Sequence, residues 1–223
     1  DMLEAASRAS TCGNMQLYSL IVTQSRELRE ALAPCHFNQP MVTQAPCVIT
    51  VCADVHRFSM WCEQRDAEPC YDNFAWFLNG VTDALLAAQN LCVEAEAHGL
   101  GICYLGTTIY TAEEIARILD LPKGVIPVTT IVVGHPDESP ELTDRLPLDA
   151  VVHCEKYHHY TSSEIDELWA EKETSEETRR LLEENGLPNL AQIFTRNRYR
   201  AEDNLAISRN YFALLKKQGF FNN

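Results

Sequence analysis

The stretch NFAWFLNGVTDALLAAQNLCVEAEAHGLGICYLG, residues 73–106, joins a long periodic segment to a short strand-like one. From Asn73 to Gly99 the apolar residues recur every three or four positions, which is the period of an amphipathic helix. This wide face comprises Phe74, Phe77, Leu78, Val81, Leu85, Ala88, Leu91 and Cys92. Gly99 predicts the end of the helix, and GICYLG (101–106) predicts a short strand entered and left through glycine. The stretch therefore predicts a central helix followed by a strand.

Further elements flank this helix on both sides. Apolar runs predict strands at LYSLIVT (17–23), APCVITVCAD (45–54) and VIPVTTIVVG (125–134). Ser25 predicts the N-cap of a short helix over 25–33. Thr111, with Glu114 three residues later, predicts a capping box at the start of a helix over 111–122. The composition of MLEAASRA (2–9) also predicts a helix.

The character of the chain changes near residue 160. The segment SSEIDELWAEKETSEETRRLLEENG (162–186) is charged and helical, with few apolar residues for a core of its own. AEDNLAISRNYFALLKKQGFF (201–221) predicts an amphipathic helix with Lys216 and Lys217 in its last turn, where they complement the helix dipole. We therefore expect a core domain over 1–160 and a helical extension over 161–223. The apolar stripe of the extension must lie on that core or on a second subunit.

Composition limits the class of partner. The formal net charge of −14 over 223 residues argues against nucleic acid or an anionic membrane as a partner. No apolar run is long enough to cross a bilayer. The nine cysteines form no Cys-x-x-Cys pair, which favours a reducing compartment, so we expect a cytoplasmic protein. No signal peptide is visible, although the chain begins at Asp1 without a Met.

The sequence also bears on three other kinds of site: a metal site, a phosphate-binding loop and a catalytic cysteine. His153, Cys154, His158 and His159 lie within VHCEKYHHY (152–160), but their spacing matches no usual zinc pattern, so we expect no metal. No phosphate-binding Walker loop and no Gly-x-Gly-x-x-Gly motif is present. A cysteine nucleophile paired with a histidine remains an alternative, yet nothing in the sequence ties a particular pair together.

The polar loop before the first strand raises a separate question. Ser10, Thr11, Asn14 and Gln16 offer hydrogen-bond donors and acceptors with little bulk. A solvated loop has this composition, and so does a loop that holds a flat ligand with polar edges. The loop alone leaves both interpretations open.

Three stretches in this order carry a family resemblance: STCGNMQ (10–16), AEAHGLGICYLG (95–106) and GHPDESPELTDRLPL (134–148). Together they resemble the FMN-dependent nitroreductase family, in particular its branch with long helical C-terminal tails, and the likeness runs from about Leu3 to the C-terminus. The resemblance implies an α+β fold, a central mostly antiparallel sheet flanked by helices, in an intertwined homodimer. It further implies two FMN sites at the subunit interface, with the helix over 73–99 as a main interface element. The tail over 161–223 would wrap the partner or cover the mouth of the site.

The resemblance also implies which residues contact the flavin. In the polar loop, Ser10, Thr11, Cys12, Asn14 and Gln16 take positions that contact the ribityl chain, the phosphate or the pyrimidine edge. Cys12 stands where relatives usually carry Ser or Thr, so one hydroxyl contact is expected to be lost or replaced.

Two more segments complete the expected flavin site. Gln44 matches a position at the flavin edge, and a glutamine amide can both donate and accept there. Tyr104, Leu105 and Gly106 are expected to present backbone amides to the N5–C4=O side of the flavin, with Gly106 allowing a close approach.

The phosphate of the cofactor requires a cation. Arg145 takes the place of the family's phosphate-binding arginine, whereas Thr143 stands where a lysine is usual. Relatives also carry an Arg-x-Ser motif ahead of the first helix, and because the sequence begins at Asp1, within that predicted helix, we expect this segment to be missing from it. A site without these partners would hold FMN less firmly.

The activity that the resemblance implies is ping-pong hydride transfer. NADPH or NADH would reduce FMN, and a nitroaromatic, quinone or flavin acceptor would then take the electrons from the same face. Arg196, Arg198 and Arg200 in FTRNRYR could read the 2′-phosphate of NADPH, or be structural. The alternatives are a flavin-binding member without reductase activity and a flavin-free structural homodimer on the same fold.

Overall fold

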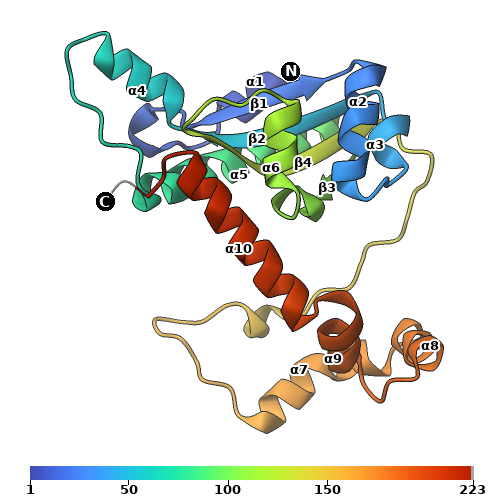
Figure 1. Ribbon diagram of the computed structural model, residues 1–223. Coiled ribbons are helices and arrows are strands. Elements are labelled where there is room, and N and C mark those ends of the chain that lie inside the picture. Colours follow the sequence, from blue (N-terminus) through green and yellow to red (C-terminus); the bar gives the residue numbers. More distant parts are fainter. Residues whose placement is uncertain (222–223) are drawn as a thin grey trace. The chain divides into compact units, whose positions relative to one another are not determined.

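Four strands form one antiparallel sheet in the order β1-β2-β4-β3 (Figure 1). The computed structural model describes residues 1–221. The strands are Tyr18–Thr23 (β1), Cys47–Asp54 (β2), Gly101–Leu105 (β3) and Val125–Gly134 (β4). The central strands β2 and β4 are almost entirely buried, as their continuous runs of β-branched residues predict. The predicted α+β class with an antiparallel sheet is confirmed.

One face of the sheet is covered by α5 (Phe74–Ala97) together with α1 (Met2–Ser7). The α5 helix begins at Asn73, whose side chain accepts a hydrogen bond from the Trp76 amide at 3.3 Å. It ends just before Gly99, which has the left-handed φ of +72° that closes a helix. The side chains that pack between helix and sheet are Ile49, Val51, Ala84, Ala87, Ala88, Leu91, Ile131 and Val133. Small alanines on α5 allow the helix to approach the strands closely.

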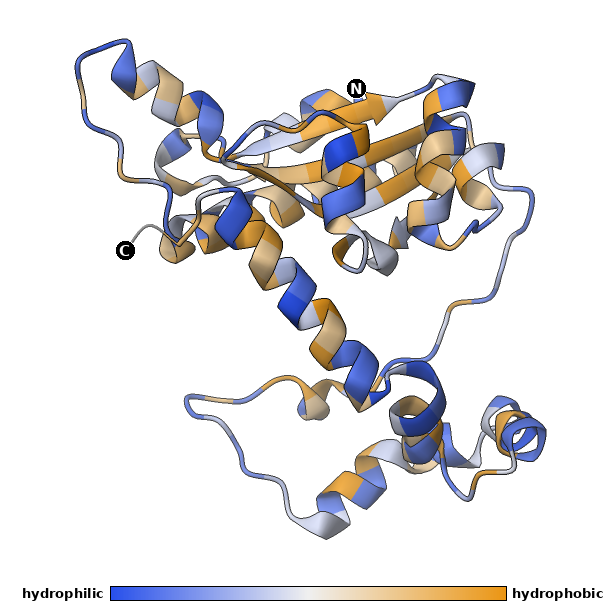
Figure 2. Cartoon of the chain, viewed as in Figure 1, coloured by the Kyte–Doolittle hydropathy of each residue, from blue (hydrophilic) through white to orange (hydrophobic). Residues whose placement is uncertain are grey.

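The opposite face carries a set of short helices. They are α2 (Arg26–Leu32), the 3₁₀ turn η2 (Ala33–His36), α3 (Met41–Gln44), the 3₁₀ turn η3 (Gly106–Ile109) and α6 (Ala112–Ile118). Strand side chains alternate between faces, so Val48 and Val132 point to this layer while their neighbours point to α5. Figure 2 shows the apolar character concentrated in the strands between the two helical layers.

Of the two helix caps predicted from the sequence, one is confirmed and the other is wrong. The Ser25 side chain accepts from the Leu28 amide at 3.3 Å, which confirms the predicted N-cap of α2. The predicted capping box at Thr111 is wrong, because the Thr111 hydroxyl donates to the Cys35 carbonyl at 2.8 Å instead. The α6 helix also ends at Ile118, earlier than expected, since Asp120 turns into the left-handed region with φ of +51°.

The end of the sheet at which β1 and β4 begin is closed by the C-terminal part of the chain. Between β2 and α5 lies α4 (His56–Glu63), and α10 (Ala201–Lys217) returns to the sheet. Leu215 and Phe220 pack with Leu17 and Ile126 in a second core cluster. The predicted helix over 201–221 is shorter by four residues, because Gly219 adopts φ of +94°.

The described chain forms two compact units. The first holds residues 1–137 and the chain from Ile207 onward, and the second holds residues 138–206. The second contains η4 (Leu148–Ala150), α7 (Ser162–Thr174), α8 (Glu176–Asn185), α9 (Leu190–Ile193) and the π-helix η5 (Phe194–Arg198). The two units are defined by the contacts within each of them. The division into a core over 1–160 and an extension over 161–223 rests on sequence composition and stays a prediction.

Candidate functional site

The polar loop before β1 is held by one buried carboxylate. Asp83 of α5 is only 2% exposed. Its Oδ2 accepts from the Thr11 hydroxyl at 2.5 Å and from the Leu17 amide at 3.1 Å, while its Oδ1 accepts from the Cys12 amide at 2.9 Å. The Thr11 hydroxyl in turn accepts from the Gln16 amide at 2.9 Å. Both ends of the loop are therefore tied to one side chain.

The loop backbone between these ties is sharply folded. Gly13, Asn14 and Gln16 have φ of +54°, +57° and +48°. This left-handed region is unfavourable for residues with a side chain, and such positions are enriched at ligand sites. The Gln16 side-chain amide donates to Asn14 Oδ1 at 2.8 Å. Asn14 and Ser10 are exposed, so the loop presents hydroxyl and carboxamide groups outward while Thr11 points inward to Asp83.

An arginine of α4 fixes the other side of the loop. The Arg57 guanidinium donates to the carbonyl of Gln16, to the carbonyl of Tyr18 at 3.1 Å and to Ser19 Oγ at 3.3 Å. It is paired with the buried Asp54 carboxylate at 3.4 Å. Charge-assisted bonds to two carbonyls make the entry into β1 rigid.

Asp83 and Arg57 are residues that the sequence analysis missed. Asp83 could have been noticed as a lone acid within the apolar face of the central helix, because a buried charge requires hydrogen-bonding partners. Its partners lie 66 to 72 positions away, so no local pattern reveals them. Arg57 follows the apolar strand that ends at Asp54, and nothing in the local sequence singles it out.

The second predicted segment lies at the end of β3. Tyr104 is 36% exposed, and burial together with the neighbouring Cys92 thiol raises the pKa of its hydroxyl. Leu105 is buried against Val48 and Val132. A Cβ placed on Gly106 would meet no atom within 4 Å, so the space in front of its backbone is open. The backbone at Gly106 is thus accessible to a flat ligand.

Two side-chain bonds tie the segment that follows β3 to η2, one from η3 and one from the start of α6. Buried His36 lies with Nδ1 2.9 Å from the Thr107 hydroxyl, and burial lowers the pKa of His36 to about 4. The imidazole is therefore neutral near pH 7. The Thr111 hydroxyl adds the bond to the Cys35 carbonyl at the same junction. Gln44, at the end of α3, is exposed beside this layer.

Within one copy, the two predicted flavin segments lie at opposite edges of the sheet. The polar loop leads into β1, and Tyr104–Gly106 closes β3, with β2 and β4 between them. Three strand spacings of about 4.8 Å place β1 and β3 roughly 14 Å apart. The buried cluster around Val51 and Ile131 fills the intervening layer. Within a single copy the two segments therefore stand at different edges of the sheet.

The four predicted arginines belong to the second unit. Arg145 is exposed and donates to Thr143 Oγ1 at 2.6 Å. Arg200 makes bonds of 2.7 and 3.1 Å to the two oxygens of Asp203. The Arg198 guanidinium lies 5.4 Å from the centre of the Phe194 ring, and Arg196 is exposed.

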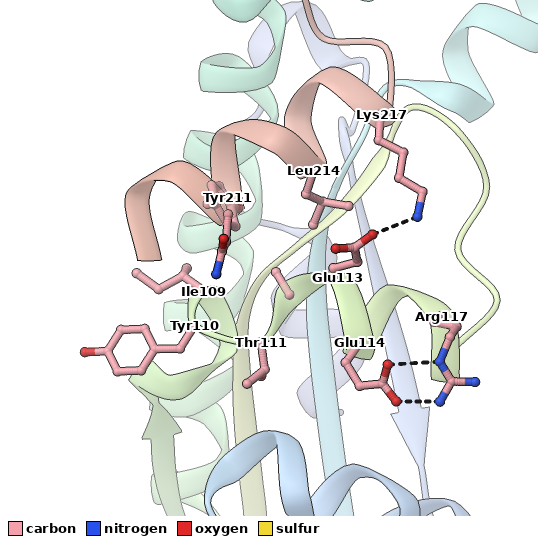
Figure 3. Close-up of a pocket in the computed structure, with 11 residues that line it drawn as sticks. Ile109, Tyr110, Thr111, Glu113, Glu114, Arg117, Tyr211, Leu214 and Lys217 are labelled. Atoms are coloured by element: carbon pink, nitrogen blue, oxygen red, sulfur yellow. Dashed lines mark hydrogen bonds and ion pairs between the residues drawn. The ribbon is translucent and has the colours of Figure 1, made fainter. Parts of the chain in front are cut away.

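A pocket of about 470 Å³ lies elsewhere in the first unit, between α6 and the last turns of α10 (Figure 3). Lys217 pairs with Glu113 at 2.8 Å on one side, and Arg117 pairs with Glu114 at 2.9 Å on the other. Because these charges already compensate one another, the pocket offers little unsatisfied charge to a ligand. None of the residues predicted from the sequence to contact the flavin lines it.

The histidines of the 152–160 segment make contacts with other side chains. The His153 ring lies 4.5 Å from the Tyr157 ring, and His158 Nε2 is 3.0 Å from Glu164 Oε1. Within residues 1–221 no group of three or more His, Cys, Asp or Glu side chains could hold a metal ion. In the same residues, no helix has both the length and the apolar character to cross a bilayer.

Comparisons with known proteins agree with this architecture. The sequence model of the nitroreductase family matches residues 1–135. FMN reductase (NADPH) of Bacillus subtilis is 33% identical over 159 residues, which cover 70% of this chain and 64% of that protein. The chain thus spans less than two thirds of the length of the curated relatives it matches.

Solved structures extend the likeness to the whole chain. A Bacteroides fragilis protein is 50% identical with a TM-score of 0.97, covering 100% of this chain and 90% of that one. NfrA2 of B. megaterium is 30% identical with a TM-score of 0.83, covering 100% of this chain and 88% of that one. The fold described here is therefore shared with proteins of this family.

Proposed function

The chain belongs to the nitroreductase family, and we propose that it is an oxidoreductase that binds FMN and takes electrons from NAD(P)H. One observation carries the proposal: a polar loop preorganised on buried Asp83 coexists with an open backbone position at Gly106. A relative with 33% identity is named FMN reductase (NADPH), which agrees with this cofactor and reductant.

The residues present fit FMN. The exposed groups of Ser10 and Asn14 and the half-buried carboxamide of Gln16 match the polar ribityl chain and pyrimidine edge. The open space before Gly106 suits a flat ring, since a side chain there would obstruct its approach. Arg145 supplies a guanidinium suited to a phosphate. Thr143 supplies no second cation, so we expect weaker phosphate binding than in relatives with lysine.

The protein's part in the reaction is orientation and electrostatics. FMN, when bound, supplies hydride acceptance and donation. We propose that backbone amides of the Tyr104–Gly106 segment, at the corner between β3 and η3, donate to the flavin. No side-chain nucleophile is needed. A site built around a flat ring suits a flat acceptor, and we propose nitroaromatic, quinone or flavin acceptors.

We further propose that the functional form is a homodimer with both copies contributing to each site. The two flavin segments lie at opposite edges of one sheet, which favours a site to which each copy contributes one of them. The outer face of α5 supports this, because four large apolar residues there are at least 42% exposed: Leu78, Leu85, Leu86 and Val93. A matching face on a second copy would cover them.

An absorbance titration tests the proposed function. FMN is added to the purified full chain, and NADPH or NADH is then added under anaerobic conditions. We expect bound flavin whose visible absorbance bleaches with reductant. Flavin that binds but does not bleach would support a flavin-binding member without reductase activity. A protein that binds no FMN would overturn the oxidoreductase proposal and favour a structural role.

A further inference from the structure

We propose that Asp83 is a positioning residue that sets the conformation of the polar loop at residues 11–17. Thr11 stabilises that loop through its bond to Asp83, which we call its brace role, rather than contacting the flavin. The shape of the loop follows from contacts within this chain. Only the effect on the flavin rests on the proposed function.

The first argument is the hydrogen bonding of the carboxylate. Asp83 is almost completely buried, and an unpaired buried carboxylate is strongly unfavourable. Its two oxygens accept three bonds, from the Thr11 hydroxyl, the Cys12 amide and the Leu17 amide. All three donors come from the loop, so the loop must adopt this conformation whenever Asp83 is buried. The helix thereby imposes the loop conformation.

The second argument is the bonding of Thr11. Its single hydroxyl proton is donated to Asp83, and its oxygen accepts from the Gln16 amide. The hydroxyl therefore has no proton left for a ligand. The exposed groups of Ser10 and Asn14, and the half-buried carboxamide of Gln16, are left to contact the flavin.

The third argument is the backbone. Asn14 and Gln16 both adopt left-handed φ angles, which asparagine tolerates but which are unfavourable for glutamine. Such angles persist only where surrounding contacts enforce them. The bonds from Asp83 bracket these two residues on both sides, at Cys12 and Leu17. Without Asp83 we expect the loop to relax and to lose its outward presentation of amides.

Hydrogen exchange on the flavin-free full chain tests the positioning role. In Asp83→Asn the side-chain amide would face backbone N–H groups, and in Thr11→Val the brace is lost. We expect amide exchange of the 11–17 segment to accelerate at least tenfold in both variants. Ile115→Ala, a buried change in another cluster, controls for a general loss of stability and should leave exchange in the segment below a twofold change. Unchanged exchange in Asp83→Asn and Thr11→Val would overturn the proposal.

FMN titration of the same variants tests the division of roles. We expect each single variant to raise the Kd of FMN about tenfold, and the double variant to bind within twofold of Asp83→Asn alone. Multiplying effects would overturn the brace role, because Thr11 would then contact the flavin independently. If the wild-type chain binds no FMN, the proposed function fails, while the exchange result still decides the role of Asp83.

Discussion

At the scale of single residues, His36 is a buried base whose charge state affects the stability of the fold. It has no measurable exposed surface, and its Nδ1 lies within hydrogen-bond distance of Thr107. Burial holds the pKa of His36 at about 4, below the value of about 6.5 for an exposed histidine. The unfolded chain therefore binds a proton between these two values when the folded chain does not.

This difference predicts a pH dependence of stability. The contribution is complete above about pH 6.5 and is lost as the pH falls toward 4, because protonation favours the unfolded state. The free energy of unfolding from urea melts should fall by roughly 2 kcal/mol more in wild type than in His36→Asn between about pH 7 and pH 4.5. Equal losses in both proteins would contradict the assignment.

At the scale of elements, α5 is the helix on which most of the structure depends. Its inner face packs on the sheet and carries Asp83, while its outer face exposes Leu85 and Leu86. A helix that is apolar on both sides is best explained by two packing partners. The first is the sheet of the same chain, and the second is the proposed second copy.

The proposed interface predicts the effect of a charge on the outer face of α5. Leu86→Glu should shift the protein from dimer to monomer in sedimentation velocity runs, because an unpaired buried carboxylate costs several kcal/mol. Leu142→Glu, at a fully exposed leucine of the second unit, is the matched control and should leave the dimer intact. A wild-type protein that sediments as a monomer at micromolar concentration would refute the dimer.

Helices and strands were predictable from the sequence where a long, uninterrupted run of apolar or β-branched residues marks them. β4 has the predicted bounds, and α5 differs from the predicted 73–99 by one residue at its start and two at its end, since runs of β-branched or periodic apolar residues dominate there. α4 was missed because it is only eight residues long and follows almost directly on β2, so its periodic signal is short. The Thr111 cap failed because a tertiary bond to Cys35 competed with the local one. The loop at residues 10–16 was found by its composition and family resemblance, whereas Asp83 was not, because its contacts span much of the chain.

At the scale of the whole molecule, the second unit carries the arginines proposed to read the reductant. These arginines differ in how far other side chains already neutralise or cover their positive charges. Arg200 is held by Asp203 and Glu202, and Arg198 lies over an aromatic ring, whereas Arg196 is exposed. Since a free guanidinium binds phosphate best, Arg196 is the strongest candidate for the 2′-phosphate of NADPH.

This ranking predicts a change in cofactor preference. Arg196→Ala should lower the ratio of kcat/KM for NADPH over NADH by about tenfold, as expected for one lost charge-assisted bond. Arg200→Ala should lower it less. Steady-state rates with both reductants measure the ratio, and an unchanged ratio in both variants would remove these arginines from reductant binding.

The nine free thiols have a practical consequence for spectroscopy. Burial raises the pKa of Cys35, Cys47, Cys52 and Cys92, so these react slowly with maleimides, while Cys70 and Cys154 are exposed. A brief maleimide pulse should therefore label these two first, as peptide mass spectrometry would show, and equal labelling of the four cysteines with raised pKa would contradict this. One exposed thiol lies in each unit. Spin labels can therefore be attached to Cys70 and Cys154 without introducing a cysteine. The dipolar distance between the two labels would report the separation of the two units.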